Sequence, residues 1–323
     1  MSIVVRENLP FSGLGDRIGF YLGLSTLGKI LDKKIITAWN VRMDHIGDNS
    51  LELFNILRFP DNIIFEKMEI LESYKNDGET FIMPNLSTFD FKEQFIKYHG
   101  VDQVPELQWK MFKLMGFNVG SKEDYMNVYQ QQGKLIKFDY PKYVNKILNH
   151  EVVQGNKYLM IHARRGDKDT NRMLIDSVTI DKLNYICDYL NSHDLLNKIK
   201  FIICSDCEKT YEMFQSCLKQ KNADIIVIPK SKTPLNNVII DYELMKNSIG
   251  IVQSVGDFVG YYAGWSSFSS VPSFIYDIPV YGTYPTDYLG DYRYNLYQKL
   301  NDDINIKNYY FSDMLDSFLR RLF

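Results

Sequence analysis

The 323-residue sequence contains little cysteine and little histidine. Its four cysteines are too few for a disulfide scaffold at this length, which predicts reduced thiols. Cys204 and Cys207 have C-x-x-C spacing, but no second pair stands at zinc-ribbon distance and the five histidines are scattered. We therefore expect no structural metal and no redox chemistry, and we interpret these cysteines as ordinary thiols in a strand-to-helix turn.

The sequence also has no excess of charge of one sign. It contains 37 basic and 40 acidic residues, for a net charge of −3. No global field attracts the chain to nucleic acid, so we expect no nucleic-acid partner. Any site for an anion must therefore be local.

Long hydrophobic runs are missing as well. No window reaches 18 apolar residues, the length that a membrane-spanning helix requires. The first residues, from Met1 to Glu7, contain no long apolar core and no cleavage site, so we expect no signal peptide.

The second half of the chain alternates between short apolar runs and stretches with helical spacing. This β-α-β-α order predicts right-handed crossovers and a parallel sheet. With 45% hydrophobic residues and room for two domains, the sequence predicts an α/β protein divided at 1–154 and 155–323. The predicted strands are residues 3–5, 34–38, 62–65, 158–161, 200–204, 224–228 and 249–252.

The apolar run at 158–161 ends in a burst of polar side chains: His162, Arg164, Arg165, Asp167 and Lys168. A buried strand that ends in this way places them at its carboxyl end, where open α/β sheets bind ligands. Two adjacent guanidinium groups suit a phosphate or diphosphate, although an arginine pair on a loop can also be a solvated patch. His162 either orients a phosphate or forms hydrogen bonds with polar groups at the end of the sheet.

The segment His-x-Arg-Arg-Gly-Asp after an apolar strand resembles the first motif of the fucosyltransferase superfamily of α1,2-, α1,6- and protein O-fucosyltransferases. The resemblance implies a GT-B architecture, with two Rossmann-like α/β domains facing across a cleft. It also implies GDP-fucose as the donor substrate, bound by the domain at 155–323, with Arg164 or Arg165 on its β-phosphate. The domain at 1–154 would take the glycan acceptor.

The opening loop is similar to that of the same superfamily at Gly13, Gly15 and Asp16. A strand, a Gly-x-Gly turn and a helix in succession can present backbone N–H groups to an anion. Golgi members of the superfamily carry a membrane anchor that this sequence lacks, so we expect a cytoplasmic enzyme. The final stretch, Ser312 to Leu322, predicts an amphipathic helix that packs across both domains.

Two further segments in the second half of the chain resemble motifs of the same superfamily. Ser205 and Asp206 end an apolar strand, where they fix a ribose or base or else cap the next helix. Asp241 lies on a helix before the strand at 249–252. The serines of the third motif are either at Ser254 or in a later stretch, which contains Ser266, Ser267 and Phe268.

The resemblance implies inverting transfer of fucose to a glycan hydroxyl, with Arg164 and Arg165 stabilising the charge that grows on the leaving diphosphate. The general base is Asp16, Asp167 or Asp169, and the sequence does not select among them. Asp167-Lys168-Asp169 spells a D-x-D metal pattern, but the arginines already fill the role of a cation. We therefore expect no metal and no cofactor besides the donor substrate.

Two alternatives stay open at this point. A GT-B transferase could use another GDP- or UDP-sugar with the same residues. A non-catalytic protein that binds a nucleotide or a glycan would need the arginines for recognition only.

Overall fold

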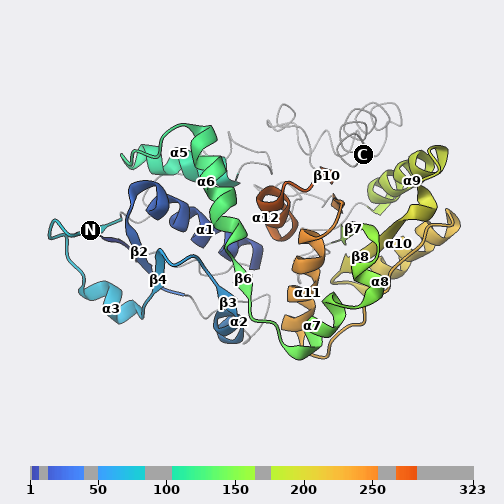
Figure 1. Cartoon of the computed structure of the whole chain (residues 1–323), viewed down its shortest axis with the longest axis horizontal. Coiled ribbons are helices and arrows are strands. Elements are labelled where there is room, and N and C mark those ends of the chain that lie inside the picture. Colours follow the sequence, from blue (N-terminus) through green and yellow to red (C-terminus); the bar gives the residue numbers. More distant parts are fainter. Residues whose placement is uncertain are drawn as a thin grey trace. The chain divides into compact units, whose positions relative to one another are not determined.

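The computed structural model describes residues 2–6, 14–39, 50–83, 104–163, 176–253 and 267–281. These residues form two compact units, each built on a four-stranded sheet (Figure 1). Unit 1 contains the described residues up to Tyr140 together with Phe274–Tyr276, and unit 2 contains the described residues between Pro141 and Ser273 and those from Asp277 onward. The boundary that the sequence predicts, at residues 154 and 155, falls within unit 2. The predicted C-terminal helix lies outside the described residues.

The sheet of unit 1 has the order β4-β2-β1-β5, and all of its neighbouring strands are parallel. Its strands are β1 (Ser2–Val5), β2 (Lys34–Thr37), β4 (Ile63–Phe65) and β5 (Thr80–Ile82). Isoleucine and valine dominate β1 and β2, as expected for strands that are buried on both faces. The three strands predicted in this half are confirmed. A separate antiparallel pair joins β3 (Leu57–Arg58) to β6 (Lys137–Phe138).

The helices of unit 1 are α1 (Leu14–Leu31), α2 (Ser50–Ile56), α3 (Met68–Ser73), α5 (Val104–Leu114) and α6 (Lys122–Lys134). Helices α1 and α5 approach each other closely because Gly23 has no side chain. A Cβ atom there would lie 2.4 Å from the carboxamide carbon of Gln108. The Nε2 group of Gln108 instead donates a hydrogen bond of 2.9 Å to the carbonyl oxygen of Gly19.

The sheet of unit 2 has the order β10-β9-β7-β8 and is also parallel throughout. Its strands are β7 (Lys157–Ala163), β8 (Ile199–Ser205), β9 (Gly250–Gln253) and β10 (Val280–Tyr281). Its helices are α7 (Lys142–Leu148), α8 (Glu151–Gln154), α9 (Asp176–Ser192), α10 (Glu208–Gln220), α11 (Pro234–Lys246) and α12 (Ser267–Tyr276).

One predicted strand is wrong. Residues 224–228 form only a single bridge, between Ile225 and Phe201. Ile226 is 6% exposed and Val227 is 60% exposed, so the segment has the alternation of an edge strand but pairs with β8 at one position only. Pro229 follows and cannot donate a ladder hydrogen bond.

The strands of unit 2 have different partners on their two faces. Leu159, Ile161 and Ala163 of β7 pack into a core cluster with Leu183 of α9 and Phe214 of α10. The alternate side chains of β7 face the other way, and the Tyr158 hydroxyl donates to the carbonyl oxygen of Leu244 on α11. The apolar run of β7 is therefore buried on both faces, as the sequence predicts.

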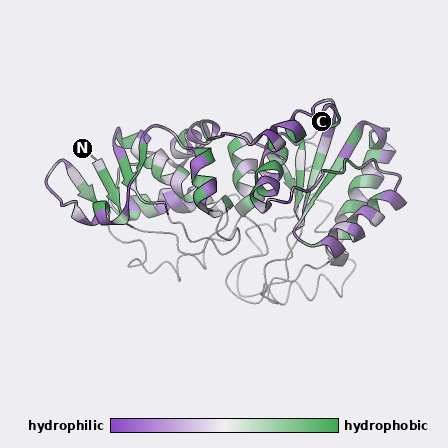
Figure 2. Cartoon of the chain, turned by 90° about the horizontal axis from the view of Figure 1, so that it is seen from below, coloured by the Kyte–Doolittle hydropathy of each residue, from purple (hydrophilic) through white to green (hydrophobic). Residues whose placement is uncertain are grey.

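Hydrophobic side chains are concentrated in the sheets of both units. Figure 2 shows the strands mostly in green, whereas the helices carry purple residues along part of their surface. Among the helices that the structure describes, none is both long and apolar enough to cross a membrane.

The C-terminal end of α12 belongs to unit 1 and packs on α6 there. The ring of Phe274 meets Tyr129 edge to face at 5.6 Å, and the Nε2 group of Gln130 donates to the Phe274 carbonyl oxygen at 2.9 Å. A Cβ atom on Gly133 would lie 2.7 Å from the side chain of Ile275, so glycine permits the close contact.

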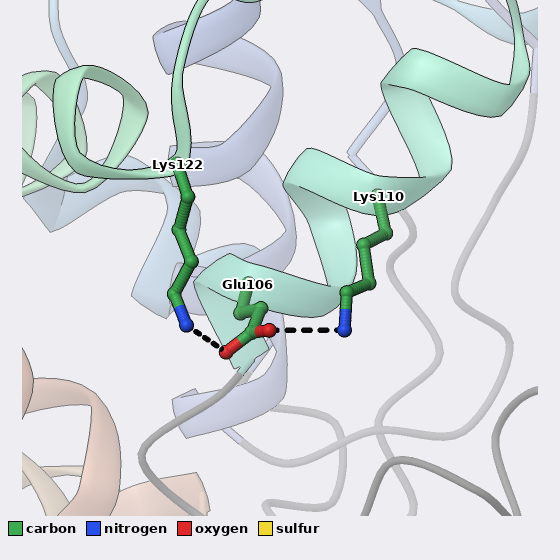
Figure 3. Close-up of polar contacts among 3 residues, drawn as sticks. All are labelled: Glu106, Lys110 and Lys122. Carbon is green, nitrogen blue, oxygen red and sulfur yellow. Dashed lines mark hydrogen bonds and ion pairs between the residues drawn. The ribbon is translucent and has the colours of Figure 1, made fainter.

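Glu106 on α5 forms ion pairs with a lysine of the same helix and with a lysine at the start of α6 (Figure 3). Its carboxylate lies 2.9 Å from the Nζ of Lys110 and 2.6 Å from the Nζ of Lys122. Burial raises the pKa of Glu106, but the hydrogen bonds and charges of Lys122 and Lys110 outweigh it, so the pKa lies below its usual value of 4.5. The carboxylate form therefore stabilises the fold.

We expect Glu106→Gln to lower the free energy of unfolding by about 1 kcal/mol at pH 7, a value that allows for the exposure of both lysines. Because the pKa of Glu106 is depressed in the fold, this contribution is present above pH 4.5 and is lost as the pH falls below it. Urea denaturation at pH 7 and pH 4 measures the difference. Glu123→Gln, at an exposed position on α6, is the matched control and should change stability by a few tenths of a kcal/mol at most. An equal loss in both variants would contradict the assignment.

Candidate functional site

The strand order of unit 2 creates a switch point between β7 and β9. From β7 the chain crosses to β8 on one side, whereas β9 lies on the other side and leads to β10. In open α/β sheets, ligands bind outside the carboxyl ends of the strands at such a point. The carboxyl ends of β7 and β9 are His162-Ala163 and Gln253.

Three polar or thiol side chains form one row across this end of the sheet. The parallel register aligns His162 of β7 with Cys204 of β8 and with Gln253 of β9. Aligned residues of neighbouring strands project from the same face, and the core cluster with α9 and α10 occupies the opposite face. The row therefore faces α11 and α12.

Ser269 of α12 connects two members of the row. Its Oγ lies 2.9 Å from Nδ1 of His162 and accepts a 2.7 Å hydrogen bond from Nε2 of Gln253. Exposed fractions are 5% for His162, 1% for Gln253 and 0% for Ser269. These hydrogen bonds between buried groups fix the orientation of the imidazole ring.

The ring of Phe268 lies beside the same histidine. Its centroid is 5.6 Å from that of the His162 ring and 6.2 Å from that of Tyr242 on α11. Phe268 thus connects the start of α12 to both β7 and α11. We find it packed as a partly buried aromatic side chain next to the row.

The third member of the row, Cys204, contacts Asp241 of α11. Burial raises the pKa of the Asp241 carboxyl from 3.8 to about 6, against the opposing effects of a hydrogen bond with Cys204 and the charge of Lys230. Burial also raises the pKa of the Cys204 thiol, and the nearby Asp241 carboxylate raises it further. Cys204 therefore remains a protonated thiol that can donate to Asp241, and it is not a nucleophile.

Ser205 and Asp206 follow directly at the end of β8. The Oγ of Ser205 accepts from the backbone N–H of Cys207 and lies 3.1 Å from the carbonyl oxygen of the same residue. The residue at the N-cap position of α10 is Cys207, so the interpretation of Ser205 and Asp206 as N-caps is wrong. The Ser205 hydroxyl instead closes the turn that leads into the helix.

The resemblance to the superfamily implies a loop at Gly15, but the structure has Gly15 in a helix. Helix α1 begins at Leu14, so Gly15 lies in its first turn, where backbone N–H groups have no partner within the helix. Asp16 is in the same turn, and Ser267 is the first residue of α12.

Several predicted site residues lie outside the described residues. These are Gly13, Arg164, Arg165, Asp167, Ser254 and Ser266. Their roles stay predictions. Among the residues that the structure does describe, no group of three or more His, Cys, Asp or Glu side chains is arranged to hold a metal ion.

Sequence reasoning missed Gln253 and Ser269 as site residues. Gln253 has the same signal as His162, since it is the first polar residue after the apolar run 249–252. Ser269 belongs to the serine-rich stretch, but only helical geometry shows which of its serines meets His162.

We expect Asp241→Asn to raise the free energy of unfolding of the unliganded protein by about 1 kcal/mol at pH 8, since the carboxyl is only partly buried. The pKa of Asp241 is higher in the fold, so its charge destabilises the fold above pH 6 and this cost disappears as the pH falls toward 3.8. Urea denaturation at pH 8 and pH 4.5 should show the gain shrinking at the lower pH. Glu212→Gln, at an exposed position on α10, is the control. A destabilised Asp241→Asn protein at pH 8 would refute the assignment.

No protein-family model matches the chain, and no curated protein sequence matches it. Solved structures do match. A mutant of FUT1 from Arabidopsis thaliana in complex with GDP is 13% identical, with a TM-score of 0.50 over 87% of this chain and 70% of that one. Fucosyltransferase NodZ from Bradyrhizobium is 11% identical, with a TM-score of 0.49 over 84% of this chain and 91% of that one.

At these sequence identities, the structural similarity is evidence for a shared fold only. The FUT1 structure matches most of the chain, across both units with parallel sheets. The predicted fold class is confirmed: the chain has the α/β fold of GT-B glycosyltransferases.

Proposed function

We propose that the chain is a glycosyltransferase that transfers fucose from GDP-fucose to a hydroxyl group of a glycan, with inversion at the anomeric carbon. The main support for the proposal is the carboxyl of Asp241, whose pKa is raised by burial. It lies beside the row of His162, Cys204 and Gln253 at the switch point of the sheet. A carboxyl with a strongly raised pKa at a ligand-binding edge is a candidate functional group.

The position of His162 supports a diphosphate site at this edge. It is the last polar residue of β7, and Arg164 and Arg165 follow it within three positions of the chain. Arginine stays charged and can bind two phosphate oxygens at once. These two arginines are therefore our candidates for the β-phosphate of the donor.

Asp241 supports guanine as the base. A carboxylate can accept two parallel hydrogen bonds from the N1–H and N2–H groups of guanine, whereas uracil offers it one N–H group. Desolvation outweighs the hydrogen bond with Cys204 and the charge of Lys230, so the Asp241 carboxylate is costly, and a ligand that supplies two donors relieves this cost. The GDP complex of FUT1 has the same fold and is consistent with this choice.

The chemistry follows from the charge that develops on the donor. As the bond between fucose and diphosphate breaks, negative charge grows on the β-phosphate, and fixed cations stabilise that state more than the ground state. Arg164 and Arg165 fill this role in the proposal, without a metal ion. Asp16, Asp167 or Asp169 takes the proton of the acceptor hydroxyl.

Nucleotide binding tests the donor. We expect GDP to bind with at least tenfold lower Kd than UDP at pH 8, measured by isothermal titration calorimetry. If the Asp241 carboxylate accepts from guanine, its protonation weakens GDP binding about tenfold at one pH unit below its pKa of about 6. GDP itself titrates in this range, so Asp241→Asn is measured in parallel and should remove the part of the pH dependence that Asp241 causes. Tighter binding of UDP would favour a UDP-sugar transferase instead.

Turnover tests the reaction. With GDP-fucose and a panel of glycans, we expect Arg164→Ala to lower kcat/KM at least a hundredfold, because it removes a cation that acts in the transition state. Arg58→Ala is the control, since Arg58 pairs with Asp139 in unit 1, and it should keep full turnover. Excess chelator should leave the parent enzyme active. A folded parent protein that binds GDP but transfers no sugar from any GDP-sugar would favour a non-catalytic binding protein.

A further inference from the structure

Lys230 brings a positive charge to the carboxyl end of β8. It lies in the connection between the segment 224–228 and α11, and its Nζ is 5.9 Å from the centroid of the Tyr211 ring. That ring is in the first turn of α10 and packs against the core cluster of α9 and α10, which holds it in place. The charge of Lys230 also acts to lower the pKa values of the Cys204 thiol and the Asp241 carboxyl. The ammonium group and the Asp241 carboxyl are therefore at the same edge of the sheet.

The backbone is fastened on both sides of Lys230. On one side, the Tyr143 hydroxyl donates a 3.0 Å hydrogen bond to the carbonyl oxygen of Pro229. On the other side, the carboxamide of Asn237 accepts from the N–H group of Ser231 at 2.7 Å and donates to its carbonyl oxygen at 3.0 Å. A lysine in an exposed connection is ordinarily a solvated charge, but here the fixed backbone limits the region that its side chain reaches.

Lys230 and Asp241 act on each other at a distance. The Asp241 carboxyl forms a hydrogen bond with Cys204, whereas Lys230 affects the same carboxyl through its charge rather than through a hydrogen bond. The distance of the ammonium group from the Tyr211 ring is close to the limit of about 6 Å for a cation–π contact, so that contact is weak. A ligand can therefore use the acceptor oxygens of Asp241 and the N–H donors of Lys230 together.

We propose that Lys230 is a specificity-determining residue, which donates a hydrogen bond to the oxygen at position 6 of a purine base while Asp241 accepts from the adjacent N1–H group. The inference rests on the proposed function, because it concerns the base of the same nucleotide. It narrows the ligand to the diphosphate of a 6-oxopurine nucleoside.

The edge of a 6-oxopurine matches these two side chains in one orientation. Its O6 accepts and its N1–H donates, on neighbouring atoms of the ring. An ammonium group has donors only and a carboxylate has acceptors only, so Lys230 takes O6 and Asp241 takes N1–H. A 6-amino group would instead point its N–H donors at the ammonium group. That mismatch leaves polar groups unpaired and rejects a 6-aminopurine.

Calorimetry with three nucleoside diphosphates at pH 8 isolates the contact with O6. GDP carries O6, N1–H and the 2-amino group, and IDP lacks only the 2-amino group. The diphosphate of 2,6-diaminopurine riboside carries an amino group in place of O6. We expect Lys230→Met to raise the Kd for GDP and for IDP about tenfold each, because methionine keeps an apolar stem but has no donor. The Kd for the diaminopurine nucleotide should not rise.

Lys232→Met is the matched control, since it removes the same charge from an exposed position of the same connection. It should leave all three Kd values as in the parent protein. Lys230→Arg keeps a charged donor and should recover most of the affinity for GDP. An equal loss for all three nucleotides in Lys230→Met would show that the charge only attracts the diphosphate, and it would overturn the proposal. An unchanged Kd for GDP would overturn it as well.

Turnover separates this inference from the proposed function. If Lys230→Met weakens GDP and IDP selectively but the parent protein transfers no sugar, the role of Lys230 stands and the transfer reaction fails. If the parent protein transfers fucose from GDP-fucose and Lys230→Met binds GDP as tightly, the reaction stands and the role of Lys230 fails. A folded parent protein that binds none of the three nucleotides overturns both.

Discussion

The candidate site depends on the parallel register of three strands. Because β7 is aligned with β8 and β9, His162, Cys204 and Gln253 project from one face at one level of the sheet. A slip by one residue would turn each of them toward α9 and α10, where the neighbours are apolar. The apolar residues of the opposite face, such as Leu159 and Ile161, therefore determine the direction of the polar row.

The two helices over this face carry complementary groups. Ser269 of α12 meets His162 and Gln253, and Asp241 of α11 meets Cys204. The carboxyl of Asp241 is kept in surroundings that disfavour its charge. Such an arrangement weakens the unliganded fold, and groups with perturbed pKa values are typical of functional sites.

Much of the fold follows from the sequence, but the site follows only in part. Unbroken apolar runs predict β7, β8 and β9, and the polar residues after them identify His162 and Ser205. The run at 224–228 has a similar apolar composition, yet it forms only one bridge, and the proline that follows it cannot donate a ladder hydrogen bond. Ser269 cannot be chosen from its serine-rich neighbours by sequence, because the turn of α12 decides which hydroxyl faces the strand. The resemblance to the superfamily implies a loop at Gly15, but helix α1 begins one residue earlier, at Leu14.

Helix α12 has a consequence for how the chain acquires its structure. Its last residues, Phe274–Tyr276, complete the packing of α6 in unit 1, although they follow the described residues of unit 2 from Pro141 to Ser273 in the sequence. Proteins are synthesised from the N-terminus, and domains generally fold as they emerge. Unit 1 is built from discontinuous segments, so Phe274 and Ile275 can pack against Tyr129 and Gly133 only after α12 has been synthesised. A fragment that ends at Tyr140 would lack Phe274–Tyr276, and the surface of α6 that these residues cover would be exposed to solvent.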